Sequence, residues 1–109
     1  MHSREERLAL NEVLFRRANE RIEDAAQEHA VPDVPIGFYC ECADRDCTEQ
    51  LVITAHEFRN VRTRSTQFLV RPGHQIPAIE FIVTETPAYL VVEKTGEAAE
   101  VVTEHLEDA

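Results

Sequence analysis

The chain has 109 residues, 43% of them hydrophobic and 29% charged, which fits one globular domain over residues 1–109. Its formal net charge of −10 opposes binding to phosphate backbones and to anionic lipid surfaces. No apolar run reaches the roughly 20 residues that span a bilayer, and the N-terminus lacks the apolar segment of a secretory signal. We therefore expect a cytoplasmic protein that does not bind membranes.

The first 30 residues predict one long helix, from Ser3 to about Ala30, because they contain no proline or glycine and many Arg, Glu, Leu and Ala. Leu8, Phe15 and Ile22 recur at heptad spacing and predict its apolar face. The face runs over only about three heptads, so docking onto a sheet competes with coiled-coil pairing.

Two asparagines border this apolar face, Asn11 and Asn19, four residues to either side of Phe15. A buried asparagine needs hydrogen-bond partners, so each would bond within the fold or contact a second molecule. The alternative is that both lie at the edge of the face in solvent. We take Phe15, Asn11 and Asn19 as candidate partner-binding residues.

The rest of the chain predicts five strands and two helices. The pattern Thr-Ala-His-Glu from Thr54 is a capping box that opens the middle helix, and a Pro-Gly turn follows the third strand. The resulting α+β fold has a long N-terminal helix and a small, mainly antiparallel sheet within residues 36–94. The expected strands are 36–42, 51–53, 67–71, 78–84 and 88–94, and the helices are 54–61 and one within 95–106.

The three cysteines fall within eight residues at the spacing C-x-C-x4-C. Alternate side chains of a strand share a face, so Cys40 and Cys42 point the same way, while Glu41 between them points to the opposite face. The turn-forming Ala-Asp-Arg-Asp that follows returns Cys47 toward them. An odd number of cysteines argues against a disulfide framework. The spacing predicts a zinc-knuckle-like hairpin.

The fourth ligand is expected to be His74, which follows the Pro-Gly turn. His56 in the middle helix is the rival, and a carboxylate or a water is a further alternative. Three thiolates and one imidazole form a common tetrahedral Zn²⁺ set that leaves no open coordination position, so the metal would be structural. Two other interpretations stay open: a redox switch that uses these thiols, and three buried thiols without a ligand.

A belt of arginines crosses the middle of the chain, where residues 58–79 contain no acidic residue. A basic belt on an acidic protein would meet an acidic partner, an acidic helix of the same chain, or nucleic acid, which the net charge disfavours. The belt completes the set of candidate partner-binding residues with Arg59, Arg62, Arg64 and Arg71.

Three segments of the chain resemble a family of small uncharacterised actinobacterial proteins. These are CECADRDC from Cys40, QFLVRPGH ending at His74, and YLVVEK from Tyr89. The opening helix, with Asn11-Glu-x-Leu-Phe-Arg, is also similar to theirs. The resemblance covers most of residues 11–100. It implies that the Pro-Gly-His segment accompanies the cysteines, which supports His74 as a ligand, and it implies no activity.

The leading hypothesis is a small cytoplasmic zinc-binding protein that acts as a protein-interaction or regulatory module with an unknown protein partner. The alternatives are a zinc-thiolate redox sensor and a nucleic-acid or ribosome-associated protein that uses the arginine belt. Enzyme activity is not expected, because the sequence contains no Gly-rich phosphate loop, H-E-x-x-H or G-x-S-x-G motif.

Overall fold

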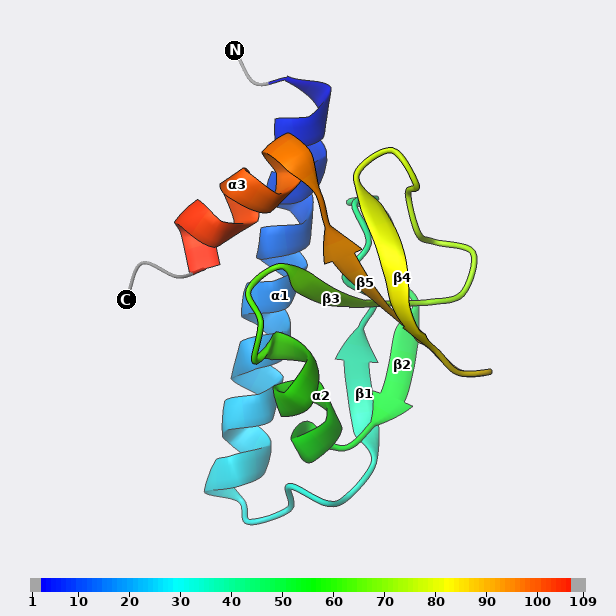
Figure 1. The fold of residues 1–109 in the computed structure, drawn as a ribbon. Coiled ribbons are helices and arrows are strands. Elements are labelled where there is room, and N and C mark those ends of the chain that lie inside the picture. Colours follow the sequence, from blue (N-terminus) through cyan, green and yellow to red (C-terminus); the bar gives the residue numbers. More distant parts are fainter. Residues whose placement is uncertain (1–2, 107–109) are drawn as a thin grey trace.

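The computed structural model describes residues 3–106 as an α+β fold of three helices and five short strands (Figure 1). The longest element, α1, would span about 37 Å at 1.5 Å per residue, most of the 42 Å long axis of the molecule. The α+β prediction is confirmed. The helices are α1 (Arg4–Glu28), α2 (Ala55–Arg62) and α3 (Gly96–Leu106), and the strands are β1 (Ile36–Tyr39), β2 (Gln50–Ile53), β3 (Gln67–Val70), β4 (Glu80–Glu85) and β5 (Leu90–Lys94).

Capping residues begin both α1 and α2, and the one at α2 was predicted. The Ser3 hydroxyl accepts a hydrogen bond from the Glu6 N–H and begins α1. At α2 the Thr54 hydroxyl accepts from the Glu57 N–H, and the Glu57 carboxylate accepts from the Thr54 N–H. The capping box therefore fixes where the chain leaves the first hairpin.

The strands form two antiparallel sheets rather than the single sheet that the sequence predicted. One contains only β1 and β2, and the other has the order β3-β5-β4. The first strand ends at Tyr39, although its prediction extended to Cys42, because the following residues leave β2 for other partners. The Glu41 N–H donates to the Leu69 carbonyl of β3 (2.7 Å), so the cysteine segment bridges the two sheets.

The helices lie to one side of the sheets. There α3 packs against the N-terminal half of α1, and α2 lies near the C-terminal half of α1 (Figure 1). Cys40 and Cys42 belong to the core cluster that includes Phe68, Val92 and Val102. A second cluster gathers Phe38, Phe58 and Leu69 with its neighbours around α2 and the first hairpin. The cysteine segment thus lies inside the fold.

The buried face of α1 is not the predicted apolar one. Leu8, Phe15 and Ile22 are only partly buried, and Leu14 is 56% exposed. The buried positions follow the same heptad spacing, displaced toward polar residues: Ala9, Glu12, Arg16, Asn19, Glu23 and Ala26. Charged side chains occupy this face because other elements supply counter-charges to each of them.

Candidate metal centre

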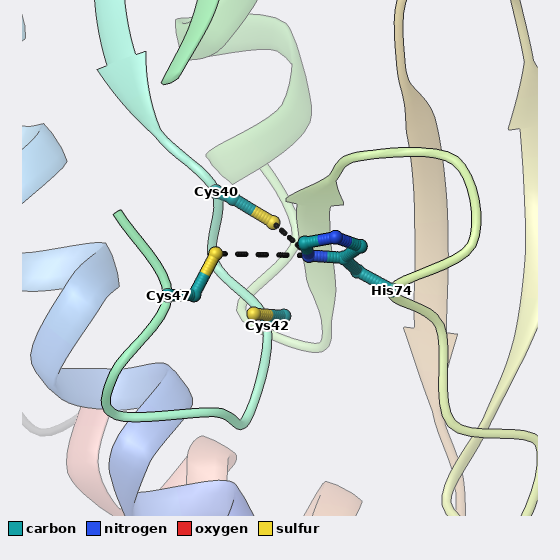
Figure 2. A group of neighbouring side chains, drawn as sticks. All are labelled: Cys40, Cys42, Cys47 and His74. Carbon is teal, nitrogen blue, oxygen red and sulfur yellow. Dashed lines mark hydrogen bonds between the residues drawn. The ribbon is translucent and has the colours of Figure 1, made fainter. Parts of the chain in front are cut away.

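Four side chains from distant parts of the sequence meet at one point, as Figure 2 shows. Cys40 and Cys42 follow β1, Cys47 closes the turn, and His74 comes from the loop between β3 and β4. Each offers one donor atom, and these atoms all lie within 4.8 Å of one another. The two cysteines after β1 are buried, while Cys47 and His74 are partly exposed.

Two nitrogen-to-sulfur distances in the cluster match those around a tetrahedral zinc ion. Zn–S bonds of about 2.3 Å and a Zn–N bond of about 2.1 Å set sulfur and nitrogen donors about 3.6 Å apart. His74 Nδ1 lies 3.6 Å from Cys40 Sγ and 3.6 Å from Cys47 Sγ (Figure 2). The four residues are therefore positioned to bind a metal ion, with Nδ1 as the imidazole ligand.

A tight turn delivers the histidine. The His74 N–H donates to the Arg71 carbonyl (2.9 Å) across Pro72 and Gly73, and Gly73 has φ 93°. Proline at the second position and a positive φ at the third define a type II turn, which glycine adopts without strain. The Arg71 N–H also donates to Cys40 Sγ (3.2 Å), so the same turn supports a thiolate.

A second turn returns Cys47. The Cys47 N–H donates to the Asp44 carbonyl (3.1 Å), and the Asp46 N–H donates to Asp44 Oδ1 (2.9 Å). The Asn11 side chain of α1 donates to the Ala43 carbonyl (2.8 Å) and fixes this turn against the helix. The turn chemistry expected from Ala-Asp-Arg-Asp is therefore accompanied by a tertiary contact.

Three thiols this close together cannot all ionise without a cation. A hydrogen bond from the Cys42 thiol, helped by the Arg71 N–H, lowers the pKa of Cys40 below its ordinary value. Donating that bond, together with burial, raises the pKa of Cys42, and burial raises the pKa of Cys47. A divalent cation would replace the shared protons, which is how thiolate sites couple metal binding to proton release.

The rival histidine lies elsewhere. His56 is exposed in the first turns of α2, and its Nδ1 is 2.6 Å from Asp33 Oδ1. It does not belong to the cluster of potential ligands. Of the two histidines that the sequence left open, the structure brings His74 to the cysteines.

The residue between the first two ligands anchors the site to the fold. Glu41 is completely buried, and its carboxylate accepts hydrogen bonds from Arg16 Nε (3.0 Å), Asn19 Nδ2 (3.0 Å) and the Leu69 N–H (2.9 Å). Arg16 in turn lies between two aromatic rings, 4.3 Å from the Phe68 centroid and 5.7 Å from that of Phe58. Glu41 therefore attaches the cysteine segment to α1.

The sequence interpretation missed this role of Glu41 and its partners. It placed Glu41 on the opposite face to the cysteines but did not identify charged residues of α1 as its partners. The available signal was the heptad spacing of polar residues between Ala9 and Ala26, at positions 12, 16, 19 and 23.

The candidate partner-binding residues of α1 have different locations. Asn19 is fully buried and bonds to Tyr39 and Glu41, which is the bonding within the fold that the sequence left open for it. Asn11 is partly exposed and holds the cysteine turn. Phe15 is also partly exposed, with its ring 6.3 Å from that of Tyr39.

The arginine belt is not one continuous surface. Arg64 precedes β3 and Arg71 follows it, so the two lie toward opposite ends of this strand. Arg59 is exposed on α2. The other three each pair with a glutamate of this chain: Arg62 with Glu23, Arg64 with Glu93 and Arg71 with Glu49. Most of the belt therefore meets acidic residues of its own fold.

No described helix is both long and apolar enough to cross a bilayer. Comparisons of the chain with protein-family models, curated proteins and solved structures find no match. The resemblance to the actinobacterial group stays a prediction, and the metal centre stands on its geometry and donor chemistry alone.

Proposed function

We propose that this chain is a zinc-stabilised protein-interaction module in which the ion has a structural role. The observation that carries the proposal is the convergence of three cysteine sulfurs and one histidine nitrogen within 4.8 Å. Soft thiolates with one imidazole favour Zn²⁺ over Mg²⁺, Ca²⁺ or Mn²⁺, which prefer oxygen ligands. Four protein ligands fill a tetrahedral shell, which is typical of structural rather than catalytic zinc.

The size of the fold supports a structural role. Zinc binding to thiolate-imidazole peptides contributes about 10–16 kcal/mol, whereas the net stability of a domain is about 5–15 kcal/mol. The ligands come from both sides of β3, so one ion would join the cysteine turn to the loop before β4. Its binding would therefore decide whether these segments are ordered.

An interaction role is supported by apolar side chains on the surface of this acidic chain. Phe81, Ile82 and Val83 follow one another on β4, an edge strand of its sheet, and are 55%, 42% and 46% exposed. Adjacent exposed apolar residues on a sheet edge are typical of protein-binding surfaces. A cytoplasmic location is part of the proposal, because reduced thiols bind zinc.

Metal content tests the site. Native mass spectrometry of protein produced without chelator is expected to show one zinc per chain, and Cys47→Ser or His74→Ala to lose it. His56→Ala is the matched control and should retain zinc. Replacement by Co²⁺ should give the visible absorption of a tetrahedral thiolate site. Protein that holds no stoichiometric zinc would contradict the proposal.

Oxidation separates this proposal from a thiol sensor. Cys40 and Cys42 are 1% and 3% exposed, and this burial shields both sulfurs from peroxide. Cys40 Sγ also accepts a hydrogen bond from a backbone N–H. Zinc is therefore expected to stay bound in dilute hydrogen peroxide, as measured by mass spectrometry. Rapid zinc release with formation of a disulfide would favour the sensor instead.

A further inference from the structure

A hollow lies beside the metal centre, between the first turns of α1 and the cysteine turn. It is a surface hollow of about 400 Å³. Its wall combines three arginines with one amide and two apolar side chains: Arg4, Arg7, Arg45, Asn11, Leu8 and Leu10. Guanidinium groups from two separate segments thus face one space.

The charge of this hollow is unusual for a chain of net charge −10. Five other arginines pair with glutamates, namely Arg16, Arg17, Arg62, Arg64 and Arg71. Arg4 and Arg45, by contrast, make no ion pair with any residue from 3 to 106, and no carboxylate in that range lines the hollow. Arg4 and Arg45 repel each other across the hollow, so an anionic ligand between them would relieve this repulsion.

Neither acidic neighbour of Arg45, Asp44 or Asp46, forms an ion pair with it. Asp44 Oδ1 accepts the Asp46 N–H (2.9 Å), and Asp44 lines a separate hollow with His74 and Cys42. Arg45 therefore lacks a counter-ion within its own turn.

Part of the wall of the hollow is apolar. Leu8 and Leu10 are partly buried and pack against the core cluster around Phe68. Asn11 holds the cysteine turn in place by its bond to Ala43, which keeps Arg45 opposite the helix. A ligand would thus contact both guanidinium groups and hydrocarbon, which suits an amphipathic segment.

We infer that this hollow binds a short partner segment in which carboxylates alternate with apolar side chains. Guanidinium groups pair with carboxylates through two parallel hydrogen bonds, and the leucines would cover the apolar side chains. A polyanion such as nucleic acid would instead feel the repulsion of the whole acidic surface. The inference rests on the proposed function, because Arg45 belongs to the turn between ligands Cys42 and Cys47.

Fluorescence anisotropy tests the site on zinc-loaded full-length protein. The probe is a fluorescein-labelled peptide of alternating Glu and Leu, compared with one of alternating Gln and Leu. Arg45→Gln is expected to weaken binding of the acidic peptide about fivefold, the effect of one exposed ion pair, and Arg4→Gln/Arg45→Gln to weaken it further. The Gln-Leu peptide should bind more weakly to wild type.

Arg21→Gln is the matched control, since Arg21 is exposed on the same helix about 25 Å from Arg4 and should leave affinity unchanged. Equal loss in this control, or an acidic peptide that does not bind zinc-loaded protein, would overturn the inference. So would a single-stranded oligonucleotide that binds more tightly than the peptide and depends on Arg45. Zinc content measured on each sample separates these failures from failure of the metal site.

Discussion

At the scale of single residues, the most informative feature is the balance of buried charge on α1. Arg16 is matched by Glu41, and Glu23 by Arg62. Lys94 contacts two buried carboxylates, Glu12 and Glu80, so this group has one negative charge too many. A buried excess charge is unfavourable, and a proton on one carboxylate removes it.

Glu12 is the carboxylate whose surroundings favour this proton. Its Oε1 is the one buried side-chain oxygen or nitrogen between residues 3 and 106 that lacks a hydrogen-bond partner, and burial, opposed by Lys94, raises the pKa of Glu12 to about 7. Burial also lowers the pKa of Lys94. Glu80, by contrast, accepts hydrogen bonds from both Lys94 and the Ile76 N–H, the latter at 2.8 Å.

A pH-dependent stability follows from the raised pKa of Glu12. The folded chain keeps a proton that the unfolded chain releases above 4.5, so the free energy of unfolding falls as pH rises from 4.5 to about 7. Glu12→Gln, which is neutral throughout, should remove this loss. We expect its stability relative to wild type to rise by about 1 kcal/mol between about pH 6 and pH 8.5.

Urea unfolding in excess zinc at several pH values measures this difference, and the contribution of the metal ligands cancels between the two proteins. Glu100→Gln, an exposed position on α3, serves as the control and should show no such trend. A stability difference between Glu12→Gln and wild type that is constant with pH would show that Glu12 stays ionised.

The residue scale also shows what the sequence could predict. The ligands Cys40, Cys42 and Cys47 could be predicted because their spacing and the turn residues between them act locally. Pro-Gly before His74 likewise specifies a turn. The burial of the charged residues could not be predicted, because their partners lie far away in the sequence. Glu12 and Lys94, for example, are separated by 82 positions. A pattern of hydrophobicity alone assigns such residues to solvent.

At the scale of elements, the end of α1 contains a strained residue. Ala30 has φ 58°, in the left-handed region that favours glycine. The Val31 N–H donates to the Ala26 carbonyl (2.9 Å) and the Ala30 N–H to the Gln27 carbonyl (3.1 Å). These are the two bonds of a Schellman motif, in which this position is usually glycine.

Ala30→Gly is therefore expected to stabilise the protein. Relief of the left-handed strain outweighs the added entropy of glycine in the unfolded chain, for a net gain of about 0.5–1 kcal/mol. Ala25→Gly, on an exposed part of the same helix, should instead destabilise by about 1 kcal/mol. Urea unfolding of both variants measures the two effects, and destabilisation by both would exclude the motif.

Element types were easier to predict than sheet composition. Thr54 and Glu57 form a local capping box, which predicts the start of α2. The prolines soon after Ala30 predict the end of α1. The division into two sheets depends on which strands pair, and β3 pairs with β5 rather than with β1. That choice follows from the side chains that fill the space between the sheets, which strand propensity does not contain.

At the scale of the whole molecule, the metal centre and the docking of α1 share one residue. Glu41 stands between ligands Cys40 and Cys42, and its carboxylate receives Arg16 and Asn19 from α1. It also bonds to Leu69 of β3 through both its side chain and its backbone. Movement of the ligands would displace the carboxylate that holds the helix, so metal binding and helix docking are expected to form one cooperative unit.

Glu41→Gln tests this coupling. The substitution keeps the shape of the side chain but leaves the Arg16 guanidinium buried without a counter-charge, which should lower the free energy of unfolding by about 3 kcal/mol. It should also weaken zinc binding, measured by competition with a chelator, and speed hydrogen exchange along the middle of α1.

Glu49→Gln is the control: its contact with Arg71 (3.5 Å) is half exposed, and its loss should change stability by less than about 1 kcal/mol. Arg16→Met/Glu41→Gln removes the unpaired charge and should recover part of the stability. If Glu41→Gln destabilised the fold yet left zinc affinity unchanged, the helix and the metal centre would be independent.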